Sequence, residues 1–403
     1  MARIPTALVT GSIGKTTTTR MLAHVLRGTG RRVAVGSTSG AQLDNLVFKQ
    51  EDSAHGGTIR QFLQDPRVEV VVGEVSRGGL LKGGLRLREA DVGAMLNILD
   101  AHLGEDGVST REDLLQIKSL VARAATQALV LNVDDPLLRG VYDRQASCEH
   151  CLVGSMPPHG LLRDHLASGG LGALWRDGPD GVVVLCRGDT TLCEIPAAEI
   201  QGAWGGMCRA TVIAAAFVAV MSERMGVAPD LIRERILGFD ASLNPGRAER
   251  IDTPGQSIVL SWAGTPEALR SLAVLMESLR TELHSRTRIL LRLGFSAADH
   301  WMCSMAAEAC RLFDVVDIAR GESCADRVEE EAVAMILEAG FGADPGVDLR
   351  YVGEVHAAIP TFLKDAAPGD PVLVHALDVH TAKARILEWL HTESLDRSEV
   401  LGA

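Results

Sequence analysis

The segment LVTGSIGKTTTTRML, residues 8–22, constrains the fold of this 403-residue chain more than any other. An apolar strand runs into Gly11-Ser-Ile-Gly14, then into Lys15, Thr16 and a helical pattern. Glycines in such a turn let backbone amides converge on an anion at the helix N-terminus. Lys15 can reach the β- and γ-phosphates of a nucleotide, and the hydroxyl of Thr16 suits Mg²⁺. The spacing GxxGK[ST] is shorter than in the common phosphate loop, but its strand–helix context predicts a nucleotide site in an α/β domain.

Short apolar strands alternate with helical segments along the first half of the chain. The expected strands cover residues 7–10, 32–37, 68–73, 92–98 and 127–133, and the expected helices cover residues 15–28 and 58–64. A further helix follows Ser109, and Glu112 stands three residues later, as in a capping box. This alternation predicts a mostly parallel sheet covered by helices, with ligand sites at the carboxyl ends of the strands.

The second half of the chain changes character twice. Residues 148–200 hold short runs separated by Gly, Asp and Pro turns, which predicts a small antiparallel β-meander. Residues 210–225 are almost wholly apolar and predict a buried helix. The turn Asn244-Pro-Gly-Arg247 then breaks the chain, and the strand–helix rhythm restarts after it. We therefore expect an α/β fold with a phosphate-loop domain over residues 1–247, containing the meander, and a smaller α/β domain over residues 248–403.

Composition excludes several classes of partner. The formal net charge of -12 argues against nucleic acid or an anionic membrane surface. The longest apolar run, residues 210–221, is too short to span a bilayer, and no signal peptide precedes the first strand. Eight scattered cysteines are typical of a reducing cytoplasm. Cys148 and Cys151 have the spacing of metal ligands, but no second pair follows, so both structural zinc and a surface turn remain open.

Three residues downstream of the phosphate loop are candidates for the same site. Glu74 ends the strand expected at 68–73, where its carboxylate faces the phosphate loop and can bind a metal directly or through water. His102 follows the strand expected at 92–98, and Lys118 lies on the capped helix. Taken alone, each has an ordinary interpretation: a solvated glutamate, a structural histidine and a surface lysine.

Together these motifs form a set with a fixed order. GxxGKT, Glu-x-x-Arg-Gly-Gly, Asn…His-Leu-Gly, Glu-Asp-Leu…Lys and Leu-Asn-x-Asp-Asp-Pro follow one another along the chain. This order resembles the Mur ligase superfamily, and within it most of all the Mur-ligase-like half of cyanophycin synthetase. The resemblance is strong over residues 7–140, weaker over residues 170–250 and architectural beyond that.

The resemblance implies an ATP-dependent ligase that activates a carboxylate as an acyl phosphate and couples it to an amine or amino acid. It implies catalytic roles for Lys15, His102 and Lys118, the last matching a lysine that is carbamylated in many relatives. It also implies two Mg²⁺ ions, one near Thr16, Thr38 and Glu74 and one held by Glu74 with His102. The implied nucleotide contacts are Gly11, Ser12, Ile13, Gly14, Lys15, Thr16, Thr17 and Arg247.

The resemblance also implies an architecture and partners. A central ATP-binding domain is followed by a C-terminal Rossmann-like domain that brings the amine. Because the phosphate loop begins near residue 10, we expect no N-terminal UDP-binding domain. The expected partners are a small-molecule carboxylate and an amine or amino acid, with no nucleic acid or membrane, in a cytoplasmic homo-oligomer such as a dimer.

Several segments depart from the family pattern, and two of them concern the nucleotide base and its contacts. Met207-Cys208…Thr211 stands where relatives carry the amide side chains that hold adenine, and Ser261-Trp-Ala-Gly-Thr-Pro266 replaces a segment whose aspartate contacts the nucleotide. Either the base is held differently, with Trp204 or Trp262 stacking on it, or ligase turnover has been lost. The sequence thus leaves three functions open: an amide ligase, a degenerate relative that serves as a binding or scaffold subunit of a biosynthetic complex, and a small-molecule kinase.

Overall fold

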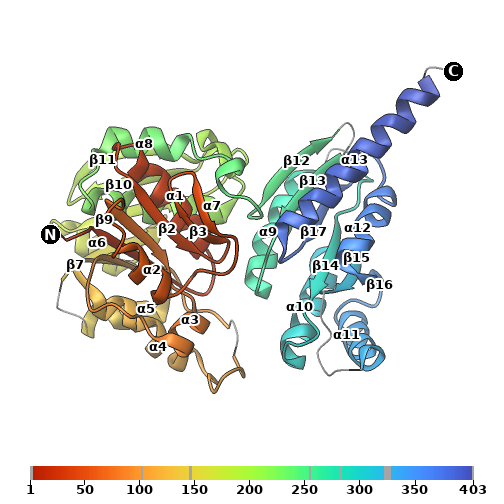
Figure 1. Ribbon diagram of the computed structural model, residues 1–403, viewed down its shortest axis with the longest axis horizontal. Coiled ribbons are helices and arrows are strands. Elements are labelled where there is room, and N and C mark those ends of the chain that lie inside the picture. Colours follow the sequence, from red (N-terminus) through yellow and green to blue (C-terminus); the bar gives the residue numbers. More distant parts are fainter. Residues whose placement is uncertain are drawn as a thin grey trace. The chain divides into compact units, whose positions relative to one another are not determined.

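The computed structural model describes residues 3–100, 103–144, 148–253, 256–280, 284–321 and 328–401, with only the backbone given for residues 252 and 393–401. The chain folds into two compact units, Met1–Asn244 and Pro245–Ala403 (Figure 1). The first unit is built on an 11-stranded sheet and the second on a 6-stranded sheet. Both sheets are mostly parallel and covered by helices, so the predicted α/β fold class is confirmed.

The large sheet of the first unit has the order β11-β10-β9-β8-β7-β6-β1-β5-β2-β3-β4. Its parallel strands are β1 (Thr6–Thr10), β2 (Val33–Ser37), β5 (Val70–Glu74), β6 (Ala90–Met95), β7 (Ala125–Asn132), β8 (Glu149–Ser155) and β9 (Leu171–Arg176). The antiparallel strands β3 (Gly40–Leu43), β4 (Leu46–Lys49), β10 (Val182–Arg187) and β11 (Thr190–Pro196) complete the two edges. Strand β1, which leads into the phosphate loop, is therefore central and buried on both faces.

Helices cover both faces of this sheet. Ala7 and Val9 of β1 belong to one apolar cluster with α1 (Lys15–Arg27) and α7 (Arg209–Arg224), whereas Leu8 belongs to another on the opposite face. The remaining helices of the unit are α2 (Gly56–Phe62), α3 (Arg77–Gly83), α4 (Arg111–Ala124), α5 (Pro136–Arg144), α6 (Gly160–Ala167), α8 (Pro229–Leu237), η1 (Ala197–Glu199), η2 (Gln201–Ala203) and η3 (Ala241–Leu243). The predicted buried helix at residues 210–225 corresponds to α7, whose middle residues are wholly buried.

Two local expectations differ from the structure. The span 148–200 begins with parallel strand β8 and helix α6, so the antiparallel meander is limited to β9–β11. Because β8 continues the parallel pairing of β7, these strands extend the main sheet. The capping box also lies one residue later than expected. Thr110 caps α4, since its hydroxyl accepts a hydrogen bond from the Asp113 amide at 3.1 Å, and the Asp113 carboxylate in turn accepts from the Thr110 amide at 3.0 Å.

The second unit has the strand order β12-β13-β17-β14-β15-β16, and β12 pairs antiparallel with β13 while the other neighbours pair parallel. Its elements are β12 (Glu249–Thr253), β13 (Gln256–Ser261), α9 (Pro266–Ser278), β14 (Arg288–Leu293), α10 (Asp299–Leu312), β15 (Val315–Arg320), α11 (Glu329–Ala343), β16 (Asp348–Glu354), α12 (Val355–Lys364), β17 (Pro371–His375) and α13 (Val379–Leu401).

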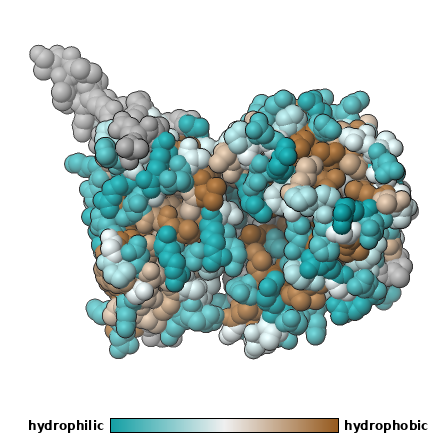
Figure 2. Space-filling model, turned by 180° about the vertical axis from the view of Figure 1, so that it is seen from behind, coloured by the Kyte–Doolittle hydropathy of each residue, from teal (hydrophilic) through white to brown (hydrophobic). Residues whose placement is uncertain are grey.

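Apolar residues are gathered inside each unit. On the face drawn in Figure 2, hydrophilic residues predominate and hydrophobic ones form small patches. The large exposed hydrophobic side chains include three consecutive residues of edge strand β4, Leu46, Val47 and Phe48. Within the described ranges, every helix is too short or too polar to cross a membrane.

Candidate nucleotide and metal site

The phosphate loop has the backbone geometry that its glycines allow. It joins β1 to α1, with Gly11 at φ +156° and Gly14, the N-cap of α1, at φ +85°. A Cβ atom on Gly11 would stand 2.9 Å from the Cβ of Leu96, so a larger residue cannot fit without movement. Lys15 lies at the start of α1, and its Nζ donates to the carbonyl of Ser12 at 3.0 Å, across the loop. The loop therefore places an ammonium group beside a helix N-terminus, the arrangement that binds phosphate.

Asn97, which follows β6, holds this loop in place. Its Oδ1 accepts hydrogen bonds from the amides of Ser12 and Ile13, both at 2.9 Å, and its Nδ2 donates to the Ile13 carbonyl at 3.2 Å. The amides of Ser12 and Ile13, which we expected to face phosphate, are thus bonded within the protein. This clamp was missed at the level of sequence, although the position of Asn97 after a strand adjacent to β1 was a usable signal.

Three oxygen-bearing residues meet beside the loop. Thr16 Oγ1 lies 3.0 Å from Glu74 Oε2 and 3.0 Å from Thr38 Oγ1, and the Thr38 amide donates to Glu74 Oε2 at 3.1 Å. Glu74 is only 1% exposed. Mg²⁺ prefers octahedral oxygen ligands at about 2.1 Å, which places neighbouring ligand oxygens about 3 Å apart. The chemistry and spacing of these donors therefore fit one Mg²⁺ ion.

Lys118, on α4, is brought to the same loop. Its side chain is 2% exposed, and its Nζ donates to the carbonyl of Gly11 at 2.7 Å. Burial, assisted by the positive charges of Lys15 and Arg77, lowers the pKa of Lys118 well below its usual range, while Glu74 opposes that shift. Lys118 is thus a buried amine beside the phosphate loop, and the surface-lysine interpretation is wrong.

The other expected site residues are placed as follows. The hydroxyl of Thr17 accepts a hydrogen bond at 3.2 Å from Asn244 Nδ2, and Asn244 Oδ1 accepts one from Arg20 at 3.1 Å, so the end of the first unit is tied to α1. Arg247 belongs to the second unit, where its guanidinium donates to the carbonyl of Gly246 at 2.9 Å. His102 lies outside the described residues.

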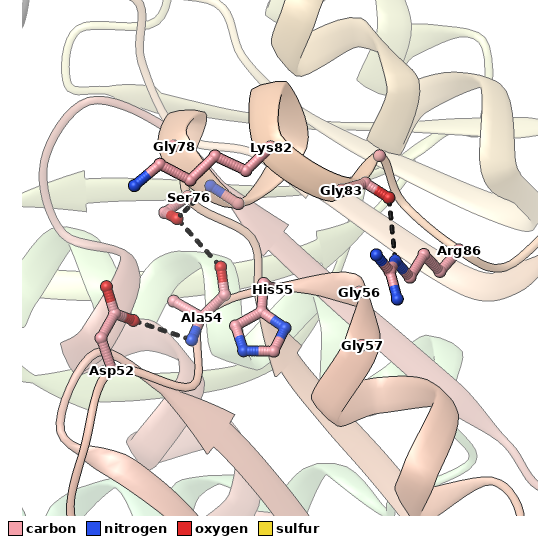
Figure 3. Close-up of a pocket in the computed structure, with 12 residues that line it drawn as sticks. Asp52, Ala54, His55, Gly56, Gly57, Ser76, Gly78, Lys82, Gly83 and Arg86 are labelled. Atoms are coloured by element: carbon pink, nitrogen blue, oxygen red, sulfur yellow. Dashed lines mark hydrogen bonds between the residues drawn. The ribbon is translucent and has the colours of Figure 1, made fainter.

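A pocket of about 400 Å³ lies between the segments that precede and contain α2 and α3 (Figure 3). Its lining residues are Asp52, Ala54, His55, Gly56, Gly57, Ser76, Gly78, Gly79, Lys82, Gly83, Gly84 and Arg86. Ser76 stands two residues after Glu74, and the Ser53 amide, next to Asp52 and Ala54 of the lining, donates to the Ser37 carbonyl at 2.9 Å. Both lining segments are thus connected through the backbone to residues of the oxygen cluster formed by Thr16, Thr38 and Glu74.

The rim of this pocket carries more positive than negative charge. Lys82 and Arg86 lie toward opposite ends of it, with His55 between them (Figure 3). Across the part of the chain that is described, neither Lys82 nor Arg86 forms an ion pair; Arg86 Nε donates to the Gly83 carbonyl at 3.0 Å. The carboxylate of Asp52 accepts from the Ala54 amide at 2.9 Å. The pocket is therefore suited to an anionic ligand.

The surroundings of Cys151 argue against a structural zinc site at the cysteine pair. Cys151 is buried in β8, and burial, with the Glu149 carboxylate nearby, raises the pKa of its thiol, which disfavours the thiolate that zinc requires. Among the residues that the structure covers, no cluster of three or more His, Cys, Asp and Glu side chains could hold a metal ion.

Fold and site together define an α/β protein whose central strand leads into a phosphate loop, followed by a second α/β unit. Residues 9–155 match the Mur ligase middle domain family, and the resemblance to the Mur ligase superfamily is thereby confirmed. The match covers the phosphate loop, Glu74 and Lys118.

Curated relatives extend the similarity along nearly the whole chain. The chain is 27% identical over 402 residues to cyanophycin synthetase of Geminocystis herdmanii, covering 98% of this chain and 44% of that protein. It is 30% identical over 377 residues to cyanophycin synthetase of a Nostoc species, covering 92% of this chain and 41% of that protein. The chain thus spans less than half the length of these relatives.

A solved structure shares the fold. The bifunctional folylpolyglutamate synthase/dihydrofolate synthase of Yersinia pestis, complexed with AMPPNP and a manganese ion, matches with a TM-score of 0.68 at 18% identity. The match covers 96% of this chain and 89% of that one.

Proposed function

We propose that the protein is an ATP-dependent carboxylate–amine ligase that releases ADP. The observation that carries this proposal is the meeting of Lys15, Thr16, Thr38, Glu74 and Lys118 at the carboxyl ends of β1, β2 and β5. In this proposal residues 1–247 are the ATP-binding domain, with Arg247 at its end as a contact to the nucleotide phosphates, and residues 248–403 bring the amine. The ligase names of the curated relatives support the same class.

The proposed reaction has two steps. An oxygen of the acceptor carboxylate attacks the γ-phosphorus of ATP, the bond to the β-phosphate oxygen breaks, and ADP leaves. The amine then attacks the carbon of the acyl phosphate, loses a proton, and displaces inorganic phosphate to give an amide. Lys15 stabilises negative charge on the transferring phosphoryl group. Thr16, Thr38 and Glu74 would hold Mg²⁺, which supplies further charge neutralisation on the phosphate oxygens.

Lys118 carries the second part of the proposal. Only an uncharged amine can attack CO₂, and its lowered pKa supplies one beside the loop. The lysine nitrogen bonds to the carbon of CO₂ and loses a proton, which leaves a carbamate. The new carboxylate would lie near Gly11 and Lys15, where a second Mg²⁺, with His102 as a further ligand, would complete the site.

We further propose that the pocket between α2 and α3 receives the acceptor acid. Ser76, in the pocket lining, follows Glu74 by two residues, and this proximity along the chain supports the placement of the acid on the side of the proposed metal ligands. Lys82 and Arg86 attract its negative charge, because an ammonium or guanidinium bonds a carboxylate more strongly than it bonds neutral groups.

Release of ADP and the mass of the product test the function. The full chain is incubated with Mg·ATP and pairs of candidate acids and amines; we expect release of ADP that needs both partners, with an amide product. Lys15→Ala should reduce the rate by at least a hundredfold, whereas Lys49→Ala, an exposed lysine on β4, should leave it unchanged. A phosphorylated acid as the final product would show a kinase, and equal rates for Lys15→Ala and the unaltered chain would refute the ligase.

A further inference from the structure

The backbone on both sides of Arg247 has an unusual conformation. Gly246 has φ +68° and Ala248 has φ +50°, so Arg247 stands between two residues in the left-handed region. A Cβ atom on Gly246 would collide with the side chain of Val379, so only glycine fits there. Ala248 adopts this conformation although its own Cβ disfavours it. Residues held in this way cluster at functional sites, because the surrounding structure must compensate for the strain.

Glu249, the first residue of β12, holds the amide of Gly246. Its carboxylate is buried, with the residue only 3% exposed, and Oε2 accepts a hydrogen bond from the Gly246 amide at 2.9 Å. The other oxygen, Oε1, accepts a hydrogen bond from Lys383 Nζ at 2.6 Å. Lys383 thereby compensates a charge that would be costly to bury alone. Because both oxygens are engaged, the carboxylate cannot turn away from Gly246 without losing one of these contacts.

The carbonyl of Gly246 is held as well. It accepts a hydrogen bond from the Trp262 amide at 3.2 Å and another from Arg247 Nη1 at 2.9 Å. The next amide, of Ala248, donates to the buried hydroxyl of Ser261 at 3.1 Å. Gly246 is thus fixed at its amide and at its carbonyl, and that carbonyl in turn bonds the guanidinium of Arg247.

Helix α13 supplies two of the supports of this turn. Val379, its first residue, lies against Gly246, and Lys383, four residues later, bonds Glu249. Residues four apart share one face of a helix, so a single face of α13 holds both Gly246 and Glu249. The turn that carries Arg247 is therefore braced by residues more than 130 positions away in the sequence.

The residue that precedes the turn is tied to the phosphate-loop helix. Asn244 is 4% exposed, its Nδ2 donates to the Thr17 hydroxyl at 3.2 Å, and its Oδ1 accepts from Arg20 at 3.1 Å. Arg247 follows three residues later, and three residues of extended chain span at most about 11 Å. Chain length alone therefore keeps the backbone of Arg247 within about 11 Å of a residue bonded to α1, the helix that begins at Lys15.

We propose that Glu249, with Lys383, is a positioning residue for Arg247, because it fixes the turn from which the guanidinium meets the nucleotide phosphates. This inference rests on the proposed function, in which Arg247 contacts those phosphates. Glu249 acts only through Gly246 and Arg247 and does not contact the nucleotide. A turn that is ordered in the folded chain loses little freedom when the nucleotide binds, so the contact of Arg247 contributes more of its strength to affinity.

Calorimetric titration of the full chain with Mg·ATP and with magnesium tripolyphosphate tests the inference. Arg247→Ala removes a charged contact and should weaken the binding of both ligands at least tenfold. Glu249→Met removes the acceptor for Gly246 at similar volume and should weaken both about fivefold. Lys383→Met should weaken both by roughly two- to threefold, whereas Lys383→Arg, which keeps the cation, should bind as the unaltered chain does. Lys364→Met, at an exposed lysine on α12, is the matched control and should change nothing.

The same substitutions in the Arg247→Ala background separate positioning from a merely structural role. If Glu249 and Lys383 act through the guanidinium, Glu249→Met and Lys383→Met should cause no further loss of affinity once Arg247 is absent. Urea unfolding measures the loss of stability separately, and that loss should be the same in both backgrounds. Should Glu249→Met fail to fold, Lys383→Met carries the test, because this side chain is 43% exposed and its loss leaves the core intact.

Three results would overturn the inference while the proposed function stands. They are equal losses of affinity with and without Arg247, unchanged binding in both Glu249→Met and Lys383→Met, and losses for ATP that are absent for tripolyphosphate. Unchanged binding in Arg247→Ala, with binding still weakened by Lys15→Ala, would overturn it too. If Lys15→Ala also leaves both ligands bound as tightly as before, the proposed function fails and the inference fails with it.

Discussion

Replacing Asn97 with alanine should loosen the phosphate loop and leave the sheet around it intact. The Asn97 side chain makes three hydrogen bonds to the loop, to the amides of Ser12 and Ile13 and to the Ile13 carbonyl. Ser12 also donates to the backbone carbonyl of Asn97 at 3.0 Å, so its amide keeps a partner in the variant. The two bonds at Ile13 are therefore the ones lost outright.

The size of the effect follows from those two bonds. A hydrogen bond between neutral groups contributes about 1 kcal/mol net, so the ordered loop loses about 2 kcal/mol. Ile13 is half-buried and water can replace part of this loss, so we expect the free energy of unfolding to fall by about 1 kcal/mol. A nucleotide must reorder the loop when it binds, which costs the remaining ~1 kcal/mol, and its affinity should therefore fall roughly fivefold.

Asn132 offers a matched control at the same edge of the sheet. Its Nδ2 donates to the Leu96 carbonyl and its Oδ1 accepts from the Asp134 amide, both at 2.9 Å, so Asn132→Ala also removes two hydrogen bonds. Urea unfolding should show similar losses for the two variants, and titration with Mg·ATP should show weaker binding only for Asn97→Ala. Equal nucleotide affinities for both variants and the unaltered chain would refute the role of Asn97.

Three further predictions concern single charged side chains. Burial lowers the pKa of Lys118, so between that lowered pKa and about 10.4 the unfolded chain holds a proton on Lys118 that the folded chain lacks. The free energy of unfolding should therefore rise with pH over this range. The measurement is urea unfolding at pH 7 and pH 9.5 in bicarbonate-free buffer, where Lys118→Met should reduce the difference in unfolding free energy between the two pH values. The same difference in the variant and the unaltered chain would count against a buried neutral amine. Lys82→Met should raise KM for the acceptor acid about tenfold with KM for ATP unchanged, while Lys49→Met alters neither. Glu74→Gln keeps acceptors for Thr16 and Thr38 but removes the charge, so half-maximal activity should need at least tenfold more Mg²⁺; an unchanged requirement would place the metal elsewhere.

Features of the site that depend on local sequence were predictable. The phosphate loop is a strand, a glycine turn and a helix start within one short stretch, and its backbone needs only its own glycines. Glu74 was predictable because the carboxyl ends of parallel strands share one edge, and the parallel rhythm was visible along the chain. The order of motifs indicated the resemblance to the Mur ligase superfamily, and the match of residues 9–155 to the Mur ligase middle domain agrees with it.

Features that depend on distant pairing were not predictable from local pattern. Lys118 lies in an amphipathic helix where a lysine usually faces water, and only the packing of α4 beside β1 buries it against Gly11. The pocket between α2 and α3 needs two glycine-rich segments about 20 residues apart in sequence to face each other. The hairpin of β3 and β4 was missed because a four-residue edge strand with every residue exposed has no alternating pattern.

Under the proposed function, the uneven resemblance of the chain to the Mur ligase superfamily has a physical explanation in the relative strength of the contacts. The proposed contacts to the triphosphate involve charged groups such as Lys15, and a hydrogen bond with a charged partner contributes about 1.5–3 kcal/mol. A neutral amide that reads a base contributes only about 1 kcal/mol. The absence of amide side chains at Met207, Cys208 and Thr211 is therefore compatible with nucleotide binding that depends mainly on the phosphates.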